Sequence, residues 1–158
     1  MTEEWELYRY EQARTWLEAI RSLGERVDST YKLVESMRDM LDGVKAIDPS
    51  STRSSGSSAD DAMIERIERL HENVRGYLAL LAEYEDMRVD ARRRISTMAN
   101  DAERKALTYR FLLGYPWEVI CVEMFYTHDG MMKLRRRAIV NAYEVMPLEW
   151  REPIHKAL

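Results

Sequence analysis

Apolar residues between positions 16 and 98 recur at alternating steps of four and three, which is the spacing of a coiled-coil seam. The first run has a single polar member and comprises Trp16, Ile20, Leu23, Val27, Thr30, Val34, Met37, Leu41 and Val44. The second run has a single charged member and comprises Met63, Ile67, Leu70, Val74, Tyr77, Leu81, Tyr84, Arg88, Ala91, Ile95 and Met98. Each run predicts one long helix with an apolar stripe along one face.

A segment without apolar periodicity, DPSSTRSSGSSADD, separates the two runs at residues 48–61. Its serines, glycine and proline supply no apolar surface and predict a poorly ordered loop. Asp48, which precedes a proline, is expected to end the first helix, and Asp60 or Asp61 to cap the second. Residues 1–99 are therefore predicted to form a long antiparallel, coiled-coil-like helical hairpin. Its seam either pairs within one chain or joins another copy or another protein.

Shorter helices are predicted between residues 100 and 147. Asn100 and Glu103 have the spacing of a capping box, so a helix is expected from Asp101 to Leu113, with Gly114 as its stop. The inward-facing set on that helix is expected to be Ala106, Tyr109 or Arg110, and Leu113.

Two further helices joined by a tight turn follow this first one. Pro116 suits the first turn of the next helix, on which apolar residues recur from Trp117 onward. Thr127 is expected to cap a last helix over residues 127–145, which Pro147 would stop. The packed side of that helix is predicted to comprise Met131, Leu134 and Ala138, followed by Ala142 or Val145. This is the outline of a helix-turn-helix, and residues 148–158 remain as a C-terminal tail.

The composition changes this picture little, because glycine and proline are scarce (6 and 4 residues) and an all-α fold is expected. The net charge of −4 argues against a protein that coats nucleic acid indiscriminately. However, residues 127–143 hold one acid and four bases, or +3, whereas residues 1–47 hold ten acids and seven bases, or −3. This asymmetry predicts that only the C-terminal module meets phosphate groups.

Other classes of function find little support in the sequence. The three histidines lack ligand partners at metal-binding spacings, and no nucleophile–base–acid arrangement or glycine-rich phosphate loop occurs, so neither a metal, a cofactor nor an enzymatic activity is expected. A single cysteine, Cys121, and the lack of a leader or a membrane-spanning apolar run indicate a cytoplasmic protein.

The helix-turn-helix segment resembles region four of bacterial sigma factors. The resemblance is carried by Trp117, Glu118, Ile120, Cys121, Tyr126, Thr127, Met131, Lys133, Leu134, Ala138 and Ile139. The segment departs from the pattern at Cys121, where the family prefers alanine, at Phe125, where the turn often has glycine, and at Gly130, where a polar or basic residue is common. With its long helical N-terminal part and serine-rich gap, the whole chain is similar to phage and prophage regulators of the ArpU and RinA type.

The resemblance implies that the last helix enters the major groove of double-stranded DNA with its N-terminal end near the bases. The candidate DNA-binding residues are Thr127, His128, Asp129, Met132, Lys133, Arg135, Arg136 and Arg137. Arg136 and Arg137 suit phosphates or a guanine edge. The alternative interpretation of the same charges is a solvated basic helix face.

Three functions fit these features. The first is a sequence-specific transcriptional regulator of phage or prophage origin, whose hairpin forms a homodimer or higher oligomer or contacts RNA polymerase. The second is a protein-interaction adaptor that uses the hairpin, with the helix-turn-helix as a packing unit only. The third is a DNA-recognition subunit of a phage packaging assembly, which requires a ring-forming oligomer.

Overall fold

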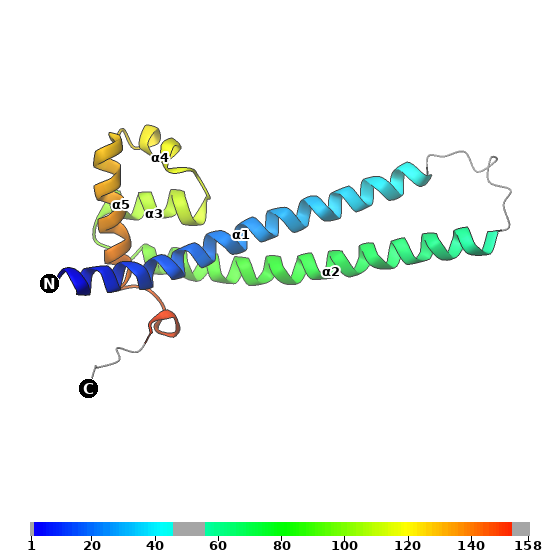
Figure 1. The fold of residues 1–158 in the computed structure, drawn as a ribbon, viewed down its shortest axis with the longest axis horizontal. Helices are drawn as coiled ribbons and strands as arrows, with labels where there is room; N and C mark the ends of the chain where they lie inside the picture. Colours follow the sequence, from blue (N-terminus) through cyan, green and yellow to red (C-terminus); the bar gives the residue numbers. More distant parts are fainter. Residues whose placement is uncertain (1, 46–55, 153–158) are drawn as a thin grey trace. The chain divides into compact units, whose positions relative to one another are not determined.

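The computed structural model of the protein describes residues 2–45 and 56–152, and the predicted all-α class is confirmed (Figure 1). These described residues contain no β-strand. The elements are α1 (Glu3–Lys45), α2 (Gly56–Ile95), α3 (Asp101–Leu107), the π-helical turn η2 (Thr108–Leu112), α4 (Trp117–Glu123), α5 (His128–Ala142) and the 3-10 turn η3 (Leu148–Trp150).

The chain divides into two compact units, and both long helices contribute to each of them. Unit 1 consists of residues 1–24 and 85–158, and unit 2 consists of residues 25–84. The modules predicted from the sequence, residues 1–99 and 100–147, were divided where the pattern of apolar residues changes, so their boundary differs from those of the two units. The helix-turn-helix therefore belongs to the same compact unit as the start of α1 and the end of α2.

In unit 2, α1 and α2 run side by side in opposite directions, as Figure 1 shows. Three of the seam residues of α1 in this unit, Val27, Val34 and Leu41, are buried, and two others, Thr30 and Met37, are half-buried. Those of α2 are half-buried, and one of them, Tyr77, lies with its ring centroid 5.7 Å from that of Tyr31. The predicted apolar stripes are thus the less exposed faces of both helices, although two helices alone cover them incompletely.

The start of α2 differs from the prediction. The helix begins at Gly56, so Asp60 and Asp61 lie inside it rather than capping it. Each residue added to an existing helix gains one backbone hydrogen bond, so the helix continues through residues 58–62 although their side chains are exposed. The expected helix stop at Asp48 and residues 48–55 of the predicted loop lie outside the described residues.

Unit 1 contains the main core of the protein. The largest fully buried side chains all belong to it, and they are Trp16, Leu17, Ile20, Ile95, Leu107, Phe111, Ile120, Met131, Leu134 and Ile139. They come from the start of α1, the end of α2 and the helix-turn-helix. At the start of α1, the Trp5 ring stacks on that of Tyr8 at 5.3 Å between centroids and lies edge-to-face with that of Tyr143 at 6.0 Å. These contacts order the N-terminal segment beside the end of α5.

Candidate nucleic-acid interface

Glu103, in the first turn of α3, links α3 to α5 within the helix-turn-helix. The Asn100 Oδ1 atom accepts a hydrogen bond from the Glu103 backbone N at 3.0 Å, as an N-cap residue does. The predicted reciprocal half of the capping box is wrong, because the Glu103 carboxylate points to α5. It accepts from Arg137 Nε at 2.8 Å and from Asn141 Nδ2 at 3.0 and 3.1 Å, and only 4% of the Glu103 side chain is exposed. This buried carboxylate fixes α5 against α3.

The predicted regular helix from Asp101 to Leu113 is interrupted by the wide turn η2. The Leu113 backbone N bonds to Thr108 O, five residues earlier, at 3.0 Å. A π-turn rotates the residues that follow it backward around the helix axis relative to a regular α-helix. For this reason Leu112 is buried, whereas Leu113, which was expected to face inward, is exposed.

The predicted packing of α4 and α5 is confirmed. Ala106, Ile120, Met131 and Leu134 form one buried cluster, against which the partly buried Trp117 and Cys121 pack. Pro116 precedes α4 as its N-cap residue rather than lying in its first turn. The start of α5 is therefore held on the apolar surfaces of α3 and α4.

Thr127 caps α5 as predicted, because its Oγ1 atom accepts from the Gly130 backbone N at 3.1 Å. A Cβ atom at Gly130 would lie 3.0 Å from that same Oγ1, which is closer than ordinary packing allows. Gly130 thus keeps room for the cap. The Thr127 hydroxyl is engaged in the cap. Within the predicted DNA-binding set, the part of Thr127 is therefore to position the start of α5.

The turn between α4 and α5 is a Schellman motif. The Tyr126 N bonds to Cys121 O at 3.0 Å and the Phe125 N to Val122 O at 3.3 Å. Phe125 occupies the left-handed position with φ +58° and is 96% exposed. A phenylalanine is strained in this conformation, which glycine adopts freely.

The predicted end of the last helix is also different. Helix α5 ends at Ala142 rather than at residue 145. Beyond it, Tyr143, Glu144 and Val145 donate backbone hydrogen bonds to the residues three positions earlier, at 3.1–3.3 Å. These tighter turns replace the α-helical ladder ahead of Pro147.

The outward face of α5 carries the predicted base-reading residues. His128, Asp129, Met132 and Lys133 are all exposed. A cleft of about 240 Å³ runs beside them between α4 and α5. Its lining comprises Trp117, Glu118, Cys121, His128, Met131, Met132 and Arg135.

The three arginines of α5 all have partners within the protein. The Arg135 Cζ atom lies 4.9 Å from the centroid of the Trp117 ring. Arg136 Nε lies 3.2 Å from Glu6 Oε1, and Arg137 binds Glu103 as described above. The side chains of Arg136 and Arg137 remain 60% and 55% exposed. Lys133 has no ion pair within the described part of the chain.

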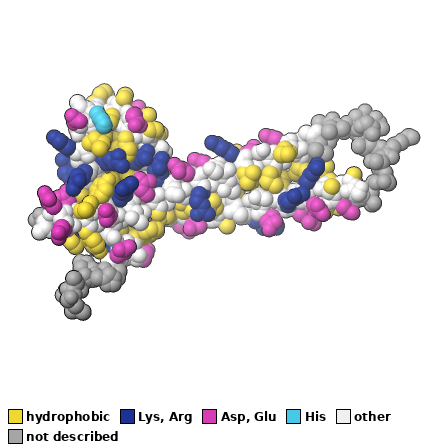
Figure 2. Space-filling model, in the orientation of Figure 1, with side chains coloured by type: hydrophobic (Ala, Val, Ile, Leu, Met, Phe, Trp, Pro, Cys, Tyr) yellow, Lys and Arg dark blue, Asp and Glu magenta, His cyan; other side chains and the backbone are white. Residues whose placement is uncertain are grey.

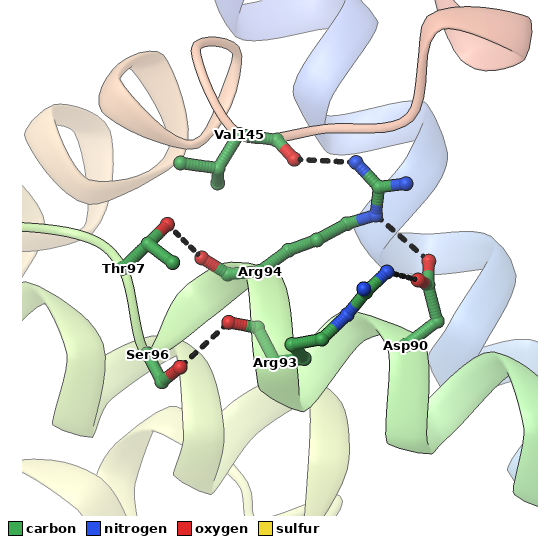
Figure 3. Close-up of polar contacts among 6 residues, drawn as sticks. All are labelled: Asp90, Arg93, Arg94, Ser96, Thr97 and Val145. Carbon is green, nitrogen blue, oxygen red and sulfur yellow. Dashed lines mark hydrogen bonds and ion pairs between the residues drawn. The ribbon is translucent and has the colours of Figure 1, made fainter.

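Three consecutive arginines, Arg92, Arg93 and Arg94, lie in the last turn of α2, and two of them make contacts within the protein (Figure 3). Arg94 donates from Nε to Asp90 Oδ2 at 2.8 Å and from Nη1 to the Val145 carbonyl at 3.2 Å. Arg93 donates to Asp90 Oδ1 at 2.7 Å. Burial alone would raise the pKa of Asp90, but the hydrogen bonds from Arg94 and Arg93 outweigh it and lower that pKa. These contacts join the end of α2 to the segment after α5.

Figure 2 shows Lys and Arg side chains gathered on the face of unit 1 that carries α3 and α5, with acidic side chains beside them. In the described ranges, no three His, Cys, Asp or Glu side chains are grouped as metal ligands would be, and no helix has the length and apolar character needed to span a bilayer. Comparison of the chain with protein-family models, with curated proteins and with solved structures finds no match.

Proposed function

We propose that this protein binds duplex DNA sequence-specifically through α5, as a transcriptional regulator of the phage or prophage type. The observation that carries the proposal is the position of α5. Its apolar side packs on α3 and α4, and its N-terminal residues His128, Asp129 and Lys133 are exposed together. A helix supported in this way and exposed at its N-terminal end is the element that helix-turn-helix proteins insert into the major groove.

The contacts within the protein support a division of roles along α5. His128, Asp129, Met132 and Lys133 occupy the first turns, where base edges are reached. Arg136 and Arg137 lie one turn later, with more than half of each side chain exposed for phosphate contact. Arg137 also holds the buried Glu103, so its removal would disturb the module as well as any DNA contact.

Selection of bound sites from random duplexes with the full chain tests the proposal, because it reveals both binding and the preferred sequence. Fluorescence anisotropy on the selected duplex should then show an affinity that falls steeply with salt. The His128→Ala/Lys133→Ala variant should lose the preference for the selected over a scrambled duplex. Lys32→Ala, an exposed lysine in unit 2, is the matched control. Absence of any enriched sequence, together with no binding at low salt, would refute the proposal.

A second candidate function, assembly through the hairpin, is favoured by exposed apolar residues that flank the seam in unit 2. Leu33 and Met40 on α1 are 52% and 69% exposed, and Ile64 and Leu78 on α2 are 53% and 54% exposed. The two members of each pair are separated by whole heptads, so they lie on the same face of their helix. In larger bundles, residues that flank a seam contact additional helices. The fitting occupant is the hairpin of a second copy, which would complete the incompletely covered seam.

The mass of the chain in solution tests this second candidate. A dimer that Leu33→Lys/Met40→Lys converts to a monomer supports it, and a monomer for the wild-type chain at all concentrations contradicts it. A ring of many copies would instead favour a DNA-recognition subunit of a packaging assembly.

A further inference from the structure

One acidic residue, Asp129, lies on the base-reading face of α5. It belongs to the first turn of the helix, its side chain is exposed, and α5 contains no other acid. Three arginines and Lys133 share the helix with it. A carboxylate on a helix that approaches phosphate groups is repelled by them and weakens binding to every duplex. Asp129 therefore opposes DNA binding unless a base supplies a contact that compensates for this repulsion.

Contacts within the protein do not explain Asp129. The N-cap hydrogen bond of α5 is accepted by Thr127, not by Asp129. Within residues 2–45 and 56–152, the Asp129 carboxylate has neither an ion pair nor a hydrogen bond. Lys133, one turn later on the same face, has no ion pair there either, although a spacing of four residues permits one. The remaining structural role, attraction to the positive end of the helix dipole, is weak at an exposed position.

The chemistry of the major groove limits which bases this carboxylate can bind. An ionised carboxylate only accepts hydrogen bonds. Guanine presents two acceptors in the major groove, and thymine presents one acceptor and a methyl group, so neither base suits it. Adenine presents the N6 amino donor beside the acceptor N7, which repels a carboxylate. Cytosine presents its N4 amino group alone and is the base that a carboxylate fits.

Lys133 complements Asp129 on the same face of α5. Its ammonium group only donates hydrogen bonds, and guanine offers O6 and N7 as acceptors. Guanine lies opposite cytosine in its base pair, so the acceptor on Asp129 and the donor on Lys133 match the donor and the acceptors along the edge of a C·G pair. Because the two side chains form no ion pair with each other, both can bind the duplex.

We propose that Asp129 is a specificity-determining residue that accepts a hydrogen bond from the N4 amino group of a cytosine, with Lys133 donating to a guanine beside it. This inference rests on the proposed DNA-binding function and deepens it, because it names a C·G pair as part of the bound sequence. Asp129 acts chiefly by rejection, since its charge is compensated over cytosine and stays uncompensated over the other bases. Specificity gained in this way lowers the affinity for all other sequences.

The test is site selection with the full chain, in its wild-type form and as Asp129→Ala, followed by anisotropy on the selected and scrambled duplexes. The wild-type site should contain a cytosine whose exchange for any other base weakens binding roughly 5- to 150-fold. Asp129→Ala should show no preference at that position, and it should bind the scrambled duplex more tightly than wild type at low salt, because a repelled charge is gone. Lys133→Ala should bind the scrambled duplex less tightly.

Two further variants make the test specific. Asp129→Asn should change the preferred base at that position from cytosine to adenine, because an amide side chain pairs with both N6 and N7. Asp28→Ala, which removes an exposed aspartate of unit 2, is the matched control and should change neither the preferred sequence nor the affinity for the scrambled duplex.

The outcomes separate the two proposals. If wild-type protein binds no duplex at low salt, the DNA-binding function fails and the role of Asp129 fails with it. If wild type selects a sequence and Asp129→Ala keeps the same preference at every position, only the role of Asp129 is overturned. Weaker binding of Asp129→Ala to the scrambled duplex overturns it as well. If Asp129→Ala loses helical content by circular dichroism, Asp129→Asn decides, and an unchanged preferred base for that variant overturns the inference.

Discussion

The buried carboxylate of Glu103 predicts an unequal effect of removing either member of its pair with Arg137. In Glu103→Ala, three hydrogen bonds are lost, but the exposed Arg137 and Asn141 side chains can bind water instead. Hydrogen bonds to charged groups each contribute about 1.5–3 kcal/mol, and rehydration recovers part of that sum, so we expect a loss of about 2 kcal/mol.

Arg137→Ala leaves a carboxylate that is 4% exposed with Asn141 as its remaining side-chain partner. Removing one member of a buried ion pair is destabilising by about 3–5 kcal/mol, and the bonds from Asn141 should keep the loss near the lower limit, about 3 kcal/mol. The arginine substitution should therefore be the more harmful one, although Arg137 is the more exposed residue. Adding Glu103→Ala to Arg137→Ala should recover about 1 kcal/mol, because no unpaired buried charge then remains.

Urea unfolding followed by tryptophan fluorescence reports on unit 1, which contains Glu103 and Arg137, and so measures these losses. All four tryptophans, Trp5, Trp16, Trp117 and Trp150, belong to unit 1, and unit 2 contains none. The double-mutant cycle gives the coupling free energy directly. A larger loss for Glu103→Ala than for Arg137→Ala, or additive losses in the double variant, would refute this account of how α5 is held.

Three further substitutions test other contacts. Phe125→Gly should raise the free energy of unfolding by about 1 kcal/mol, because the exposed ring buries nothing and glycine accepts the left-handed backbone; a lower thermal midpoint would contradict this. Glu6→Gln should change stability by less than about 1 kcal/mol, because its pair with Arg136 is exposed. The same variant should bind DNA more tightly at low salt, and weaker binding would show that Glu6 positions Arg136 usefully. Asp90 has a folded pKa below its ordinary value of 3.8, so its contribution to stability is present above that pH and is lost as pH falls through the folded pKa. Asp90→Asn should be less stable than wild type at neutral pH in urea unfolding, with the difference shrinking in acid; a constant difference would refute the role of the Arg94 bond.

Features that depend on neighbours along the chain could be predicted from the sequence. The seams of the long helices, the Thr127 cap and the burial of Met131 and Leu134 follow from local spacing, and the structure confirms them. The start of α2 at Gly56 could not be predicted, because serine and aspartate form caps in one context and helix in another.

Features that depend on distant partners were missed. The carboxylate of Glu103 has two choices, the cap at its own helix start or Arg137, which lies 34 positions later, and the sequence signals only the first. Arg110 stood in the sequence as an alternative inward-facing residue, and nothing in its local pattern indicated that it would lie over the ring of Trp117. Charge counting located the basic segment but could not show which of its arginines pairs with a buried carboxylate, as Arg137 does with Glu103.

The wide turn η2 at Thr108–Leu112 contains one residue more than a regular helical path needs between its ends. Deleting a single residue there would convert the segment into continuous α-helix while α3 and α4 kept their places. We therefore expect some chains that share this architecture to be one residue shorter at this point. An alignment gap at these positions would record the gain or loss of the bulge rather than a change of fold.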